Sequence, residues 1–314
     1  MIAPFSFRFS CVKIETSNRD RSPADDLLKY HSVLFIRIFN NPNADEADLT
    51  PGNGCKHKKK RLSPGPQAPG KSQMMKEPAM YKLELHCHNR EVSACATASA
   101  RELVDAYRAA GYSGVVSTNH INRGTYGGME DAPWEKKAER FIRGYEALKT
   151  AAGRDLDVLL GCEINLSPVE PLPGEYLSRG WMHYYPNDYL VYGVTEKWLF
   201  ETGDVRRMSL EALSQSVRAA GLLLVHAHPF RCDTVMQDPR YFDGYEVFNG
   251  NLRHDSHNDL ANAWAEMKRK IKTSGSDYHR SDDPACGGIL TDERVRDNGE
   301  LLRVLREGRY TLLR

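Results

Sequence analysis

The sequence lacks the features expected of a membrane, secreted or nucleic-acid-binding protein. It has no run of about 18 or more apolar residues, and its first residues lack the apolar core of a secretory signal. The 43 basic and 42 acidic side chains nearly cancel, so the net charge favours neither nucleic acid nor an anionic membrane. The seven cysteines form no regular framework. We therefore expect a reduced, soluble, cytoplasmic protein with no membrane partner and no stable nucleic-acid partner.

Common catalytic signatures are also missing. The chain contains no Gly-x-Ser-x-Gly nucleophile elbow, no phosphate-binding P-loop and no dinucleotide glycine fingerprint. Any hydrolytic chemistry must then come from other groups.

Residues 1–79 differ in composition from the rest of the chain. Beyond one apolar run at 33–39, they are rich in Pro and Gly and carry the basic cluster 56–61. Such a segment cannot bury enough apolar surface to offset the entropy of ordering, so we predict a disordered extension before a domain at 80–314. The basic cluster indicates either a solvated charge run or a nucleic-acid or localisation patch. A natural start at Met74, Met75 or Met80 would make the extension an upstream segment.

From residue 80 onward, short apolar runs alternate with helical patterns. Ser99 and Glu102 have the spacing of a capping box, and Gly111 is a helix stop. This alternation favours an α/β fold with a parallel sheet that closes as a barrel and has its helices outside. The expected strands are 81–89, 114–118, 156–162, 188–193, 222–225, 244–249 and 272–275, and the expected helices are 99–110, 132–152, 209–220, 259–270 and 300–307.

Polar motifs follow the expected strands at their carboxyl ends. The first is His86-Cys87-His88, where the period of two in a strand puts both imidazoles on one face. A barrel gathers the carboxyl ends of its strands at one rim, where active sites lie. The side chains that we expect to meet there are His86, His88, His120, Glu163, His228, Asp277 and His279.

Five histidines and two carboxylates exceed the four positions of one tetrahedral ion. Without thiolate ligands, this set favours Zn²⁺, Mn²⁺ or Fe²⁺ in a catalytic site, with two or three ions per chain. Glu163 is the natural bridging carboxylate. An ion pair roughly 3.5–4 Å apart activates a shared hydroxide for attack on a phosphoester.

In this order and spacing, the motifs His86-Cys-His88, Thr118-Asn-His120, Gly161-Cys-Glu163, His228-Pro229 and Gly275-Ser-Asp277-Tyr-His279 resemble the polymerase and histidinol phosphatase (PHP) superfamily. The resemblance covers about 80–314. It implies a distorted (β/α)7 barrel similar to a TIM barrel, a trinuclear metal centre and hydrolysis of phosphomonoesters or phosphodiesters. By position, it implies that His86, His88, Glu163 and Asp277 hold one pair of ions and that His120, His228 and His279 complete the cluster.

The chain departs from the family pattern at three places. Glu91 stands where many members have an Asp or His shortly after the His-x-His, so it is a candidate ligand. Asn119 replaces the usual Asp of Thr-Asp-His. No histidine follows the strand at 188–193 in the usual way, which leaves Glu196, His183 and Asp188 as candidates for the third ion.

We interpret the chain as a metal-dependent phosphoesterase that acts on a small phosphorylated molecule or nucleotide. Glu163 and the histidines would hold the ions, and Arg231 is either a phosphate clamp or an ordinary surface arginine. His226 is a ligand or a hydrogen-bond partner of one, whereas His254 and His257 are expected to face solvent. An amidohydrolase-type enzyme and a non-catalytic metal-binding accessory barrel are the alternatives. Specificity is expected in the loops 92–98, 167–187 and 231–240.

Overall fold

The computed structural model describes residues 80–166, 187–232 and 234–314. The expected extension at 1–79, candidate ligand His183 and most of the expected loop at 167–187 therefore lie outside the described residues. All described residues belong to one compact unit.

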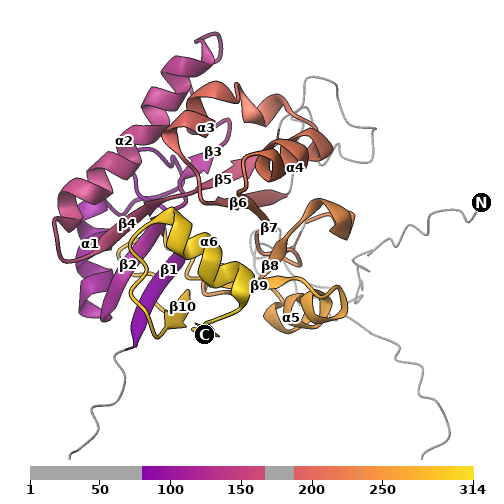
Figure 1. Ribbon diagram of the computed structural model, residues 1–314. Coiled ribbons are helices and arrows are strands. Elements are labelled where there is room, and N and C mark those ends of the chain that lie inside the picture. The colour runs from indigo at the N-terminus through magenta and orange to yellow at the C-terminus, as the bar shows by residue number, and fades with distance from the viewer. Residues whose placement is uncertain (1–79, 167–186, 233) are drawn as a thin grey trace, which may run out of the picture. The chain divides into compact units, whose positions relative to one another are not determined.

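The described strands and helices alternate along much of the chain (Figure 1), as the sequence predicts. The strands are β1 (Tyr81–Cys87), β2 (Tyr112–Ser117), β3 (His120–Ile121), β4 (Asp157–Leu160), β5 (Cys162–Asn165), β6 (Asp188–Tyr192), β7 (Leu223–His226), β8 (Gly244–Asn249), β9 (Ile271–Gly275), β10 (Ile289–Thr291) and β11 (Thr311–Leu312). The helices are α1 (Ala100–Ala109), α2 (Trp134–Ala152), α3 (Glu196–Glu201), α4 (Leu210–Ala219), α5 (Asn258–Met267) and α6 (Asn298–Glu307), with 3-10 turns at η2 (Val205–Arg207) and η3 (Pro239–Tyr241).

Local sequence signals account for where the helices begin and end. The predicted capping box of α1 is confirmed, because Ser99 Oγ accepts from the backbone N–H of Glu102 while the Glu102 carboxylate accepts from that of Ser99. After α1, Gly111 adopts a positive φ of 78°, which a residue without Cβ reaches at little cost. Ser209 caps α4 by accepting from the backbone N–H of Ala212, without the reciprocal bond of a capping box. None of the described helices is long and apolar enough to cross a membrane.

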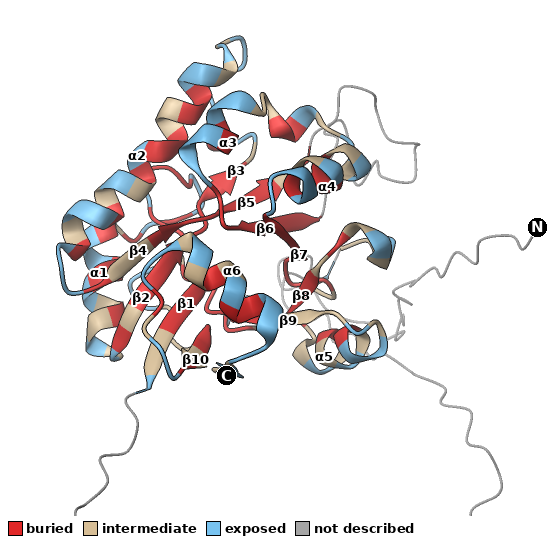
Figure 2. Cartoon of the chain, viewed as in Figure 1, coloured by how far each residue is buried: buried red, intermediate tan, exposed pale blue. Residues whose placement is uncertain are grey.

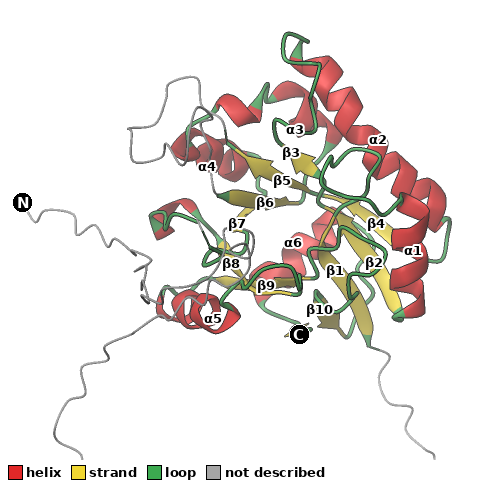
Figure 3. Ribbon diagram, turned by 180° about the vertical axis from the view of Figure 1, so that it is seen from behind, coloured by secondary structure: helices red, strands yellow, loops and turns green. Residues whose placement is uncertain are grey.

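The strands form two sheets. A five-stranded sheet has the order β11-β10-β1-β2-β4, and a six-stranded sheet has the order β3-β5-β6-β7-β8-β9. Only Gly161 separates β4 from β5, and a parallel bridge between Cys87 and Tyr278 links the end of β1 to the chain beyond β9. The mixed α/β architecture is confirmed, with helices outside the strands (Figure 3).

The expectation of a parallel sheet needs one correction. Strand β6 pairs antiparallel with both β5 and β7. A parallel pair needs a long crossover, usually a helix. Antiparallel neighbours need no such crossover. As a result, the first residue of β6, rather than the last, lies beside the carboxyl end of β5, where Asn165 pairs with Asp188.

A buried hydrophobic cluster joins the two sheets. It contains Leu83 and Leu85 of β1 from one sheet, Leu190 and Val225 from the other, and Leu301 of α6. Figure 2 shows the strands largely buried, while the helices expose their outer faces. Burial of a full Leu or Val side chain contributes about 1.5–3 kcal/mol, so this shared core holds the ends of strands from both sheets in fixed positions.

Candidate metal centre

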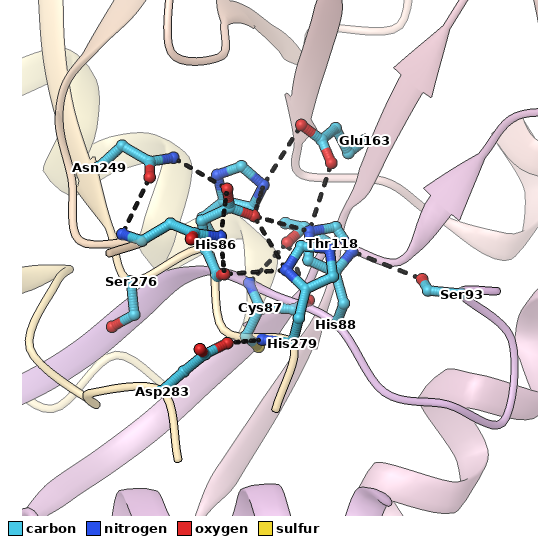
Figure 4. A network of polar contacts seen from close by, with 12 residues as sticks. His86, Cys87, His88, Ser93, Thr118, Glu163, Asn249, Ser276, His279 and Asp283 are labelled. Carbon is cyan, nitrogen blue, oxygen red and sulfur yellow. Dashed lines mark hydrogen bonds and ion pairs between the residues drawn. The ribbon is translucent and has the colours of Figure 1, made fainter. Parts of the chain in front are cut away.

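His86 and His88 lie at the end of β1 and are buried, with ring centroids 5.1 Å apart. Their Nε2 atoms converge on the carboxylate of Glu163 from β5, as Figure 4 shows. The distance from His86 Nε2 to Glu163 Oε1 is 3.3 Å, and that from His88 Nε2 to Glu163 Oε2 is also 3.3 Å. The strand that opens the domain therefore delivers both imidazoles to one carboxylate.

Two further histidines face the same carboxylate. His120 Nδ1 lies 3.0 Å from Glu163 Oε2, and His228 Nε2 lies 3.3 Å from Glu163 Oε1. Each oxygen of Glu163 thus faces two imidazoles. Glu163 therefore lies at the centre of the histidine cluster.

Asp277 lies on another side of the cluster. Its Oδ1 is 3.3 Å from His86 Nε2, 3.4 Å from His88 Nε2 and 3.4 Å from His279 Nδ1. Asp277 has a φ of 50° and His228 a φ of 26°, which non-glycine residues seldom adopt. Backbone strain of this kind is concentrated at functional sites, and here it turns both side chains into the cluster.

Asp188 completes the group, and its position follows from the antiparallel course of β6. It is the first residue of β6, and its Oδ2 lies 3.9 Å from His228 Nε2. Oxygen and nitrogen atoms of His120, Glu163 and Asp188 lie within 4.8 Å of one another. Of the two candidates for a third ion that lie in the described residues, Asp188 and Glu196, the structure brings Asp188 to the cluster.

The atoms that face the centre of the cluster have no hydrogen-bond partner among the described residues. They are His86 Nε2, His88 Nε2, His120 Nδ1 and both oxygens of Glu163, all buried. A buried polar atom without a partner costs about 1–3 kcal/mol. Divalent ions would satisfy these lone pairs, and the nitrogen and oxygen donors suit Zn²⁺, Mn²⁺ or Fe²⁺. The residues therefore fit a metal centre.

The structure forms three groups of potential ligands. His86, His88 and Asp277 form one, and His120, Glu163 and Asp188 form another that shares no residue with it. The third group, His88, His120 and His279, overlaps both. The first two groups could each hold an ion.

Glu246 of β8 orients His86 and was not singled out from the sequence. Its Oε1 lies 2.7 Å from His86 Nδ1, while its Oε2 accepts from the backbone N–H of His228 and from Asn249 Nδ2. A carboxylate on Nδ1 keeps the proton there and leaves Nε2 free to bind a metal. The sequence did carry a signal for it, because Glu246 is an acidic residue inside the expected strand 244–249.

Ser93 orients His88 as Glu246 orients His86, by facing its Nδ1 atom. Asn119 Nδ2 donates to Ser117 Oγ, so Asn119 Oδ1 is an acceptor and takes the hydroxyl hydrogen of Ser93 at 2.8 Å. Ser93 Oγ also accepts from the backbone N–H of His120 at 3.0 Å. Toward His88 Nδ1, 3.4 Å away, Ser93 therefore offers a lone pair. Asn119 is uncharged and acts on His88 through Ser93. The lone pair of Ser93 favours the proton on His88 Nδ1, so that Nε2 of the neutral ring is unprotonated.

Glu84 ties β1 to the loop that carries Asp277. It is buried and accepts from the backbone N–H groups of His86 and Ser276. It also accepts from the hydroxyls of Ser276 and Tyr107. These bonds hold the ends of β1 and β9 together directly beneath the cluster.

Burial and neighbouring charges set the protonation of the cluster. Burial lowers the pKa of His88, His120 and His228, which favours the neutral imidazole that binds metals. Burial also opposes protonation of His86, but the carboxylates around it outweigh this effect and raise its pKa well above the usual value. For Glu163, burial raises the pKa to about 8.

The cluster opens into a cavity of about 450 Å³. Its wall includes the potential ligands His120, Glu163, Asp188, His228, Asp277 and His279, together with Cys95, Asn122, Gly124, Asn165, Asn251, His254 and the four arginines Arg123, Arg231, Arg253 and Arg280. Arg231 lines this cavity and is only partly exposed, with Nη2 3.2 Å from Asp188 Oδ2 and Nη1 3.4 Å from His228 Nε2. It is therefore not an ordinary surface arginine.

Two predicted ligands do not reach the cluster. The carboxylate of Glu91 accepts from the backbone N–H of Ala100, where the positive end of α1 attracts it. Glu196 is exposed at the start of α3, beyond the carboxyl end of β6. Because β6 runs antiparallel to β5, a residue that follows it lies at the end of the sheet away from Glu163.

Two other histidines also differ from expectation. His226 packs among aromatic rings, stacked on Phe242 at 5.0 Å, and neither of its nitrogens has a partner among the described residues. The backbone turns between it and His228, so the period of two does not hold. His254 lines the cavity, with Nε2 3.6 Å from Asp277 Oδ2, instead of facing solvent.

No family model matches the sequence, and no curated protein matches it either. Solved structures do match. A two-domain protein from Bacteroides vulgatus, described as containing a predicted PHP-like metal-dependent phosphoesterase, is 15% identical with a TM-score of 0.50, over 74% of this chain and 64% of that one. PsfC from Pseudomonas syringae is 17% identical with a TM-score of 0.48, over 71% of this chain and 88% of that one. An amidohydrolase from Chromobacterium violaceum is 16% identical with a TM-score of 0.41, over 73% of this chain and 97% of that one.

The likeness to the Bacteroides protein is one of fold. It confirms the resemblance to PHP-like proteins at that level, and this chain spans 64% of the length of that protein.

Proposed function

We propose that the protein is a metal-dependent hydrolase of phosphoesters, with a small phosphorylated molecule or nucleotide as its substrate. The observation that carries this proposal is the set of buried ligand atoms without a hydrogen-bond partner among the described residues, beside a cavity that Arg231 also lines. The continuity of β4 and β5, and the bridge from Cys87 to Tyr278, further support a distorted seven-stranded barrel around this site.

The residues of the chain divide the work. His86, His88 and Asp277 form one ion position, and His120, Glu163 and Asp188 form the other. Divalent ions bound by these residues would supply Lewis-acid polarisation of the phosphoryl group and would lower the pKa of a water molecule. In the neutral imidazoles, Glu246 and Ser93 favour the proton on Nδ1 of His86 and His88, which leaves Nε2 of each ring as the atom that can bind an ion.

Arg231 supplies the fixed positive charge that a phosphoryl group needs. A guanidinium can donate two parallel hydrogen bonds to a phosphate, and it keeps its charge throughout the accessible pH range. Its contacts with Asp188 and His228 hold it beside the ion positions. An incoming phosphate would accept bonds from Arg231 at the place where the ligands converge.

The two alternatives receive less support from the described residues. Amidohydrolase-type sites use a carboxylated lysine as the bridge, whereas Glu163 holds that position here and no lysine lines the described cavity wall. A non-catalytic accessory barrel does not need a phosphate-binding arginine beside the ions. Both alternatives are outcomes of the experiment below.

The test combines metal analysis with a substrate screen. The full chain is loaded anaerobically with Mn²⁺, Fe²⁺ or Zn²⁺, its metal content is measured by elemental analysis, and turnover is assayed on phosphomonoesters, phosphodiesters, amides and lactones. We expect at least two ions per chain and hydrolysis of phosphoesters alone. His86→Ala should abolish turnover and lower the metal content, whereas His257→Ala, at a partly exposed histidine paired with Asp255, should change neither.

Fewer than two ions per chain would exclude the multinuclear site. Hydrolysis of amides or lactones without phosphoesterase activity would favour the amidohydrolase alternative. If the metal-loaded protein turned over no substrate while His86→Ala changed only its stability, the accessory role would be favoured.

A further inference from the structure

The wall of the cavity carries three arginines in addition to Arg231. Arg123 follows β3, Arg253 follows β8 and Arg280 follows β9, so three separate loops supply them. No lysine lines the described part of this wall. Arginine differs from lysine in presenting a planar fork of donors that matches the oxygens of a phosphate or carboxylate.

The carboxylates of the cavity do not neutralise all of these arginines. Glu163 and Asp277 face the histidines of the cluster, and Asp188 faces His228 and Arg231. Arg123 and Arg280 are exposed, and neither guanidinium makes a hydrogen bond or ion pair with a described residue. Both charges are therefore available to a ligand in the cavity.

Arg253 is held in place by Asp283. One oxygen of Asp283 pairs with the Arg253 guanidinium, and the other accepts from the backbone N–H groups of His279 and Arg280. Asp283 therefore holds both the guanidinium of Arg253 and the backbone of the loop that presents Arg280. A preorganised group loses less entropy when it binds a ligand.

The dimensions of the cavity leave room for a ligand larger than one phosphoryl group. At about 450 Å³, it falls within the range of roughly 300–1,000 Å³ typical of small-molecule sites. The proposed function places the reacting phosphate at Arg231 and the ion positions, so it does not use the other arginines. The three additional arginines therefore call for a second negative group on the same molecule.

We infer that the substrate is a phosphoester carrying a second anionic group, a phosphate or a carboxylate, which Arg123, Arg253 and Arg280 bind while the reacting phosphate lies at Arg231 and the metal centre. This inference rests on the proposed function and narrows its substrate class. The bond that breaks is still the ester bond of the reacting phosphate, by addition of water. The second group is not altered.

The experiment compares linear probes that differ only at their far end. For chains of three, four and six carbons, kcat/KM of the metal-loaded protein is measured on the diol monophosphate, the ω-carboxylate phosphate and the α,ω-bisphosphate, at low ionic strength because salt screens exposed charges. We expect at least one chain length at which a second anion raises kcat/KM about tenfold or more. The carboxylate and bisphosphate probes distinguish the two forms of the second anion.

Two double variants test whether the arginines cause this preference. Arg123→Gln with Arg280→Gln should bring the ratio between dianionic and monoanionic probes close to one. Arg143→Gln with Arg154→Gln removes the same charge at two exposed positions outside the cavity lining and should keep the ratio. A ratio near one in the wild type at every chain length, or a ratio that survives the first double variant, would overturn the inference.

A binding measurement separates this inference from the proposed function. Alkane mono- and bisphosphonates of the same lengths are titrated calorimetrically, since their carbon–phosphorus bonds do not hydrolyse. Tighter binding of a bisphosphonate, lost in the Arg123 and Arg280 double variant, supports the second anion site even if no phosphoester is turned over. Turnover of phosphoesters with equal binding of both probes would retain the proposed function and refute the second anion site.

Discussion

Glu246→Gln tests how the structure prepares His86 for a metal. The substitution keeps the shape of the side chain and removes its charge. In the native protein both oxygens accept hydrogen bonds, one from His86 Nδ1 at 2.7 Å and the other from the backbone N–H of His228 at 2.9 Å and Asn249 Nδ2 at 3.0 Å. Glutamine has one oxygen and one NH₂ group, so it cannot accept on both sides.

Either orientation of the glutamine therefore costs a bond. If its NH₂ faces His86, the imidazole must move its proton to Nε2, where it blocks the metal. If its NH₂ faces His228, that NH₂ and the backbone N–H of His228 are two buried donors that face each other without an acceptor. Loss of such a supporting partner typically lowers metal affinity 10- to 100-fold, which corresponds to about 1.4–2.7 kcal/mol.

The assay is a metal titration against a chromogenic competing chelator, at one pH and with each candidate ion. Glu266→Gln, which removes an exposed carboxylate paired with Lys272, is the matched control and should leave the affinity unchanged. Nitrogen-15 NMR of labelled histidine would report the tautomer of His86. An affinity within twofold of wild type, with the Nδ1–H tautomer retained, would refute the role assigned to Glu246.

Three other predictions follow from single side chains. Burial lowers the pKa of His226 to about 3, so the folded state resists its protonation, whereas the unfolded chain protonates near pH 6.5. The resulting stability is complete above about pH 6.5 and is lost as the pH falls toward about 3. Denaturant unfolding at pH 7 and pH 5 should therefore show about 2 kcal/mol less pH dependence in His226→Phe than in wild type, and equal pH dependence would contradict this. Gly144→Ala places a Cβ 2.7 Å from Asn119 Nδ2 and 2.8 Å from Val92 Cγ2, so the free energy of unfolding should fall by about 1–3 kcal/mol, and a stability equal to wild type would show that the neighbours move freely. Ser93→Ala removes the lone pair facing His88 Nδ1 and should weaken metal binding about tenfold, whereas an unchanged affinity would show that His88 needs no such support.

Local patterns in the sequence were sufficient to predict strand ends, a helix start and several candidate ligands. The alternation around His86 and His88 placed both imidazoles at one strand end, and the capping box at Ser99 located the start of α1. Such features depend on residues within a few positions of one another, so local geometry alone determines them. The ordered motifs also predicted that Glu163 and Asp277 lie near these histidines, because the carboxyl ends of neighbouring parallel strands share one edge.

Only the tertiary structure decided which remaining groups face the metal centre. Asp188 lies there, and Glu196 does not, because β6 runs against its neighbours, and strand direction is set by pairing with distant residues. Glu91 does not reach the cluster, because its carboxylate accepts a hydrogen bond from the backbone N–H of Ala100 at the amino end of α1. Glu246 reaches His86 across 160 positions of sequence. Arg123, Arg253 and Arg280 come from three loops that no local pattern connects, and they share one cavity because strand pairing and the common core between the sheets bring those loops together.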